Sequence, residues 1–226
     1  MIVTTAKKLE EIIVHIDGKK VFLIGCDICA KLCRTGGDEQ IAQYAEIMRE
    51  LGFTVVGERQ IEGVCNELLV RKFMRDNQTV LSSADTFLIA SCGNGVQVFK
   101  DFVPEKTVLP LLNTLFLGSM KTHRQFQERC YMCGDCVVGI TEGICPKTQC
   151  AKFINNGPCG GSINGRCEVD PDRECAWYRI YERMRERGRE HLLDGIFLPT
   201  NHSQDLIPRK MECDGKVPDA TGKKTK

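Results

Sequence analysis

Apolar positions in the first half of the chain follow two alternating patterns, one typical of buried strands and the other of amphipathic helices. The run VFLIG at residues 21–25 is apolar throughout, as in a buried strand. Residues 38–52 instead place apolar side chains at helical spacing and close on Gly52, a residue type common at helix C-terminal caps. Further strands are expected at residues 53–57, 86–91 and 107–112, and further helices at residues 9–16, 65–76 and 95–102.

Strands that alternate with helices at this spacing predict an α/β fold, in which right-handed crossovers join a parallel sheet. We expect this flavodoxin-like or Rossmann-like domain to span residues 1–120. A loop-rich cysteine module should occupy residues 121–176, which are dense in Cys, Gly, Asn and Pro, and a C-terminal helix and polar tail should occupy residues 177–226. The buried face of the helix at 38–52 is expected to comprise Ile41, Ala45, Met48 and Leu51. The apolar stripe of the helix at 177–197 is expected to pack against its own module or to form a partner surface, and it comprises Trp177, Ile180, Tyr181, Met184 and Leu192.

The composition points to the cysteines as candidate functional residues, because the 226-residue chain has 14 of them. A hydrophobic content of 42% can form a real core, so disulfides are not needed in its place. The chain opens without a secretory signal and has no apolar run long enough to span a membrane, so we expect a cytoplasmic protein. Thiols stay reduced in that compartment, which favours metal ligands over disulfides. The net charge of +1 provides no field to attract nucleic acid or an anionic membrane.

Five cysteines follow the ends of predicted strands. Cys26 ends the first strand, Cys65 heads a helix after the second and Cys92 ends the third, so all three are expected where ligands collect in parallel sheets. We predict a site made by these three thiols with Cys29 or Cys33, holding zinc or a further iron–sulfur cluster. Small buried thiols without a metal are the alternative. The glycines expected to turn backbone N–H groups toward these thiolates are Gly36, Gly37 and those of the CGNG segment at residues 92–95.

Eight more thiols fall in the loop-rich module, enough for two four-ligand sites, and we predict two 4Fe–4S clusters there. Such a module has little core of its own and would take folding free energy from its metal. Zinc is the competing metal. The C-x2-C-x2-C run, however, suits a cubane, and the amide N–H groups of glycine-rich neighbours can donate hydrogen bonds to its sulfides. Eight residues separate this run from the later Cys-Pro, unlike the three of a ferredoxin run, so the spacing assigns no thiol to an individual cluster. The eight are Cys130, Cys133, Cys136, Cys145, Cys150, Cys159, Cys167 and Cys175.

The same residues carry a family resemblance. The run C-x2-C-x2-C, followed by T-x-G-x-CP-K-x2-C-x-K, NGPCGG-x4-G-x-CEV and C-x-WYRIY, resembles the C-terminal module associated with methylenetetrahydrofolate reductases. The segments GCDICAKLCRTGG and SCGNGVQ resemble the N-terminal half of the small subunit of such reductases in acetogenic bacteria, and the similarity covers roughly residues 1–205. The resemblance implies an iron–sulfur subunit that passes electrons from a ferredoxin or another donor complex to the flavin of a (β/α)8 partner subunit. That partner reduces methylenetetrahydrofolate to methyltetrahydrofolate.

Motifs of a substrate site are missing from the chain, which shows no P-loop, no G-x-S-x-G elbow, no H-E-x-x-H motif and no dinucleotide or flavin fingerprint. We therefore expect a non-catalytic electron-transfer subunit, with the flavin on the partner only. The alternative is a zinc-stapled scaffold or assembly module without a redox role. Cys213, in the polar tail, is expected to be a free thiol.

Overall fold

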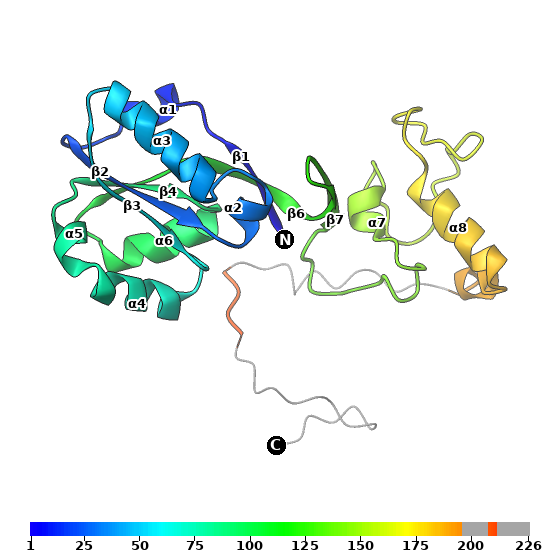
Figure 1. Cartoon of the computed structure of the whole chain (residues 1–226). Coiled ribbons are helices and arrows are strands. Elements are labelled where there is room, and N and C mark those ends of the chain that lie inside the picture. The colour runs from blue at the N-terminus through cyan, green and yellow to red at the C-terminus, as the bar shows by residue number, and fades with distance from the viewer. Residues whose placement is uncertain (196–207, 212–226) are drawn as a thin grey trace, which may run out of the picture. The chain divides into compact units, whose positions relative to one another are not determined.

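The computed structural model describes residues 1–195 and 208–211 and divides into two compact units, Met1–Cys130 and Tyr131–Lys226 (Figure 1). The sequence prediction placed the end of the α/β domain at residue 120, ten residues before this division. The predicted free thiol Cys213 and the polar tail after it lie outside the described residues. In the part of the chain that is described, no helix is both long and apolar enough to cross a membrane.

The first unit contains a four-stranded parallel sheet in the order β3-β2-β4-β5, of which β2, β3 and β4 are labelled in Figure 1. Its centre is the apolar run that the sequence predicts as a strand, where Phe22, Leu23 and Ile24 are at most 1% exposed. A strand so fully buried needs cover on both faces, which the intervening helices provide. The α/β fold with a parallel sheet is therefore confirmed. The strands are β2 (Lys20–Cys26), β3 (Thr54–Ile61), β4 (Thr86–Ala90) and β5 (Thr107–Pro110).

The helices of this unit follow the predicted pattern with shifts at their ends. Helix α3 (Asp38–Glu50) buries Ile41, Ala45 and Met48 as expected, and Gly52 adopts a φ of +83° just beyond it. Leu51, predicted on the buried face, is 46% exposed because it follows the last helical residue. The helix expected at residues 9–16 is shorter, since α1 covers only Glu10–Ile13. The remaining helices are α2 (Cys29–Leu32), α4 (Glu67–Asp76), α5 (Gln78–Ser82) and α6 (Gly93–Phe102).

A second, antiparallel sheet with the order β1-β6-β7 was not predicted. Its strands are β1 (Ile2–Ala6), β6 (Leu112–Thr122) and β7 (Gln125–Cys130). Most side chains of β6 and β7 are exposed, so neither strand has the apolar run that marks β2 and β4. Strand β1 pairs with β6, bringing Ile2 opposite Leu117, and such a distant pairing leaves no local signal.

The second unit is built around a small core. Helix α8 (Ala176–Glu186) buries Trp177, Ile180 and Met184, which pack with Ile144. The predicted packing of this stripe on its own module is confirmed for these three residues. Tyr181 is 43% exposed and the helix ends 11 residues before residue 197, so the longer predicted face is wrong. The other short elements are α7 (Pro146–Gln149) and the 3-10 helix η1 (Glu190–Leu193).

Candidate metal centres

Three cysteines stand at one edge of the parallel sheet. Cys26 is the last residue of β2, Cys92 caps the N-terminus of α6 just after β4, and Cys65 lies between β3 and α4. Because β3, β2 and β4 are parallel neighbours, their carboxyl ends meet at this edge. The chain also changes direction there, since β2 lies between the two strands that follow it in sequence, and such a switch point is where α/β sheets bind ligands. The three thiols thus lie where the sequence predicts them.

The electrostatics of Cys65 show that a fourth thiol joins this group. Although the residue is exposed overall, partial burial raises the pKa of the Cys65 thiol, and the nearby thiolates of Cys92, Cys26 and Cys29 raise it further. Repulsion between exposed like charges fades within about 10 Å in ordinary buffers, so Cys29 lies near Cys65, as Cys26 and Cys92 do. We call Cys26, Cys29, Cys65 and Cys92 the sheet-edge cysteines.

Cys29 and Cys33, which the sequence leaves as alternatives for the fourth ligand, make different hydrogen bonds with strand β1. The backbone N–H of Ile2 donates to the Sγ of Cys29 at 3.4 Å. The thiol of Cys33 instead donates to the carbonyl oxygen of Ile2 at 3.7 Å and is buried. Cys29 is therefore the sulfur that accepts a backbone hydrogen bond from β1, and Cys33 is held against the same strand as a donor.

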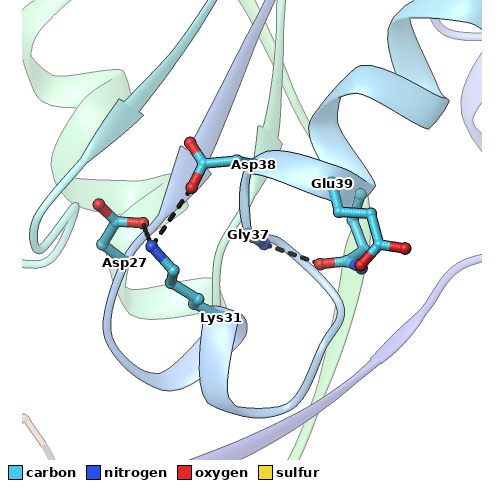
Figure 2. A network of polar contacts seen from close by, with 6 residues as sticks. Asp27, Lys31, Gly37, Asp38 and Glu39 are labelled. Carbon is cyan, nitrogen blue, oxygen red and sulfur yellow. Dashed lines mark hydrogen bonds and ion pairs between the residues drawn. The ribbon is translucent and has the colours of Figure 1, made fainter.

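The loop between β2 and α3 is held by one lysine. Figure 2 shows the Lys31 ammonium between two carboxylates, donating to Asp27 at 2.9 Å and to Asp38 at 3.3 Å. These contacts, led by the hydrogen bond to Asp27, raise the pKa of Lys31. They join the start of the loop to its end, so the segment that carries Cys29 and Cys33 is closed on itself.

The glycines of this region serve a different purpose from the predicted one. The N–H of Gly36 donates to Ala30, that of Gly37 to the side chain of Gln40 and that of Gly93 to Thr114, so none of these amides turns toward sulfur. At Gly36 a Cβ would clash with the carbonyl oxygen of Ala90, because the loop crosses directly over β4. Gly36 allows the loop to approach β4 closely. The backbone donor to a sulfur comes instead from Ile2 of β1, which donates to Cys29.

In the second unit, four cysteines line one cavity. Cys150 ends α7, Cys175 caps the N-terminus of α8, and Cys159 and Cys167 come from the glycine-rich loops between these helices. We call Cys150, Cys159, Cys167 and Cys175 the module-cavity cysteines. Trp177, only 4% exposed, forms part of the wall and donates its indole N–H to the carbonyl oxygen of Ile154 at 2.9 Å.

The donor set of this cavity fits a 4Fe–4S cluster, which takes four thiolates. The volume of the cavity is about 20 Å³, close to the minimum that holds one water. The cavity is thus smaller than a cluster, and the fit rests on its four thiol donors. In neither group do the thiols meet at single-ion distances: among residues 1–195 and 208–211, no three His, Cys, Asp or Glu side chains are placed to hold one metal ion.

Charged and backbone donors surround the cavity thiols. Lys152 forms an ion pair with Glu168, which raises the pKa of Lys152 and lowers the pKa of Glu168. The thiolates of Cys159 and Cys167 also raise the pKa of Lys152, which shows that its positive charge lies near both sulfurs. The N–H of Gly161 donates to Cys159 at 3.4 Å. Sequence patterns pointed to a glycine amide near sulfur here, but carried no signal for the Lys152–Glu168 pair.

The other four cysteines of the predicted module lie along a single stretch of chain. Cys130 is the exposed last residue of β7 and of the first unit, and Cys145 caps α7 in the second. Between them, the thiol of Cys133 donates to the carbonyl oxygen of Asp135 at 3.3 Å, and Cys136 is exposed. The turns at Met132 and Gly134 have positive φ values of 58° and 77°. This stretch is shaped by tight turns rather than by a core.

Residues 109–203 match the family described as "Methylene-tetrahydrofolate reductase C terminal". The chain thus carries a segment related to methylenetetrahydrofolate reductase. The matched segment covers less than half of the chain and includes all eight cysteines of the predicted cluster module. Comparisons with curated proteins and with solved structures find no match.

Proposed function

We propose that this protein is the electron-transfer subunit of a methylenetetrahydrofolate reductase complex. One observation carries the proposal: four thiols, Cys150, Cys159, Cys167 and Cys175, line a single cavity within the segment related to that reductase. Four thiolates around one cavity are the ligand set of a 4Fe–4S cluster. A reductase-related segment with such a ligand set suits delivery of electrons to a separate catalytic subunit.

The proposed ligand assignment divides the eight cysteines into two sets. In this proposal the module-cavity cysteines hold one 4Fe–4S cluster, and the four thiols that remain, Cys130, Cys133, Cys136 and Cys145, hold the second. A bound cluster would exchange single electrons. The protein's own contribution would be charge and shielding: Lys152 and the Gly161 amide lie near the cavity sulfurs, and Trp177 forms part of the cavity wall. Both effects tune the potential of a cluster.

The sheet-edge cysteines are proposed as a separate centre, holding zinc or a third cluster. Their position at the switch point of the sheet, and the donor that Ile2 supplies to Cys29, suit a thiolate-bound metal. Because this group lies in the first unit, its occupancy can be tested independently of the module.

The partner in this proposal is a flavin-containing (β/α)8 subunit that reduces methylenetetrahydrofolate to methyltetrahydrofolate in the cytoplasm. Hydride delivery to the folate needs a two-electron organic cofactor, and this chain's sequence has no fingerprint for one. A ferredoxin or a similar low-potential donor would reduce the clusters. The chain therefore completes an electron path and leaves the chemistry to its partner.

Anaerobic reconstitution with the barrel subunit tests this role. With a low-potential donor, methyltetrahydrofolate should form when both subunits are present and not with either subunit alone. A Cys159→Ser variant of this chain is the matched control, because it should still be present as protein but fail to support turnover. Equal turnover by the barrel subunit without this chain would contradict the proposal and favour the zinc-stapled scaffold.

A further inference from the structure

Lys147 is a buried cation with no hydrogen-bond or ion-pair partner in the part of the chain that the structure describes. The residue is 4% exposed, and its Nζ has no hydrogen-bond partner among the described residues. Lys152, five residues later, shows the ordinary arrangement: its side chain is 37% exposed and paired with Glu168. Taking an ammonium out of water costs several kcal/mol, so buried charges in proteins are paired or bound to ligands. The position of Lys147 therefore indicates a missing anion.

Among residues 131–195 and 208–211, no carboxylate supplies that anion. Glu142 has a side chain only 5% exposed, but it binds Arg187 at 2.9 Å and Arg189 at 2.6 Å. Glu168 is committed to Lys152, and Glu174 pairs with Arg179. The best-buried carboxylate near Lys147 in sequence thus already has two cations.

The place of Lys147 in the chain identifies the missing charge. Lys147 lies in α7, between Cys145 at the N-terminal cap and Cys150 at the C-terminal end. Residues three apart on a helical turn lie on one side, so Lys147 and Cys150 are neighbours, and Cys150 lines the module cavity. A cluster held by four thiolates carries net negative charge and would place it beside this cation.

We propose that the Lys147 ammonium is the internal counter-charge of the thiolate-bound cluster that includes Cys150, and that it raises the reduction potential of that cluster. This inference rests on the proposed function. Reduction adds one electron to an already anionic centre, and a fixed positive charge in a medium of low dielectric stabilises the reduced form more than the oxidised form. Lys147 is a positioning residue, because it acts through the cluster and not on a substrate.

The test is a redox titration of iron-loaded full-length protein, followed by electron paramagnetic resonance. Lys147→Met removes the charge and keeps the length of the side chain. Lys210→Met, at an exposed position of the same unit, is the matched control. We expect Lys147→Met to move the midpoint of one cluster to a more negative potential. At the wild-type midpoint the oxidised-to-reduced ratio should rise about tenfold, which is a shift of about 59 mV for a one-electron centre. The shifted signal should be the one that Cys150→Ser abolishes, and Lys210→Met should leave both signals in place.

Each outcome decides the inference. An iron-loaded Lys147→Met protein with an unchanged midpoint contradicts it, while the proposed function survives because iron is present. If Lys147→Met does not load iron, Lys147→Arg and Lys147→Gln replace it. Loading by the Arg variant alone supports a requirement for charge, whereas any other pattern of loading points to packing and overturns the inference. Absence of iron from the wild-type protein would instead defeat the proposed function itself.

Discussion

The backbone N–H of Ile2 donates to the Sγ of Cys29 across 27 residues of sequence, at 3.4 Å. The carbonyl of the same residue accepts from Cys33. One residue of β1 therefore contacts two cysteines of the loop between β2 and α3 in opposite ways, supplying a donor to one sulfur and an acceptor to the other. A metal-bound thiolate can accept but not donate a hydrogen bond, so this contact favours Cys29 over Cys33 as the fourth ligand of the proposed site.

Substitution of the sheet-edge cysteines should distinguish ligands from the remaining thiol. We expect Cys92→Ser to remove the metal of the first unit, either one zinc or about four irons per chain, because a hydroxyl is a poor ligand for both. Cys33→Ser should retain that metal. Metal content per chain, measured by mass spectrometry, checks both variants. Loss of metal from Cys33→Ser, or its retention in Cys92→Ser, would show that the four-cysteine assignment is wrong.

The module-cavity cysteines should behave as one cooperative set. Cys167→Ser is expected to lower the iron content by about four atoms per chain and to destabilise the second unit, because metal binding supplies folding free energy there. Cys133→Ala should remove a different cluster and cause a similar loss. The double variant should therefore lose about twice as much iron. Equal losses in the double and single variants would mean that the eight thiols do not form two separate centres.

Trp177 offers a direct optical report on the cavity. It is the only tryptophan of the chain, it lines the cavity and it is 4% exposed. Loading a cluster beside the indole should quench its fluorescence, and removing the iron with a chelator under anaerobic conditions should restore the emission. Cys159→Ser, which lacks a cavity ligand, should show emission that does not respond to iron and sulfide. Quenching of equal depth in that variant would place the cluster elsewhere.

Asp85 provides a pH test of the first unit that does not involve metal. Its carboxylate accepts the N–H groups of Lys20 and Lys19, each at 3.0 Å, and these hydrogen bonds lower the pKa of Asp85. A lowered pKa gives stability that is present above the ordinary carboxyl pKa of about 3.9 and lost as the pH falls through the shifted value. The stability advantage of wild type over Asp85→Asn should therefore shrink below roughly pH 4. Urea unfolding followed by circular dichroism at several pH values measures it, and an advantage that stays constant down to pH 3 would refute the assignment.

The parts of the fold that the sequence predicts are those with a local cause. Strands β2 and β4 are continuous apolar runs, and α3 carries its buried residues at helical spacing, so each element can be recognised from a short stretch of sequence. Strands β1 and β6 do not, because their pairing joins Ile2 to Leu117 and leaves most of β6 exposed. That missed sheet contains the donor to Cys29, which is why sequence patterns could not choose between Cys29 and Cys33.

The candidate sites divide in the same way. The strand-end position of Cys26, Cys65 and Cys92 follows from topology and could be predicted. The grouping of Cys150 with Cys159, Cys167 and Cys175 depends on how loops of several residues fold back, and spacing alone does not determine that. Burial of the Lys147 ammonium likewise depends on the packing of α7 against α8 and has no signature in the sequence.

Iron and acid-labile sulfide in the anaerobically purified full-length chain test the central claim most directly. The account predicts iron and sulfide in equal amounts, about eight of each per chain for two clusters, or about twelve if the sheet-edge cysteines also hold a cluster. A chain that contains zinc alone, with no labile sulfide, would contradict the electron-transfer role and leave the structural scaffold in its place.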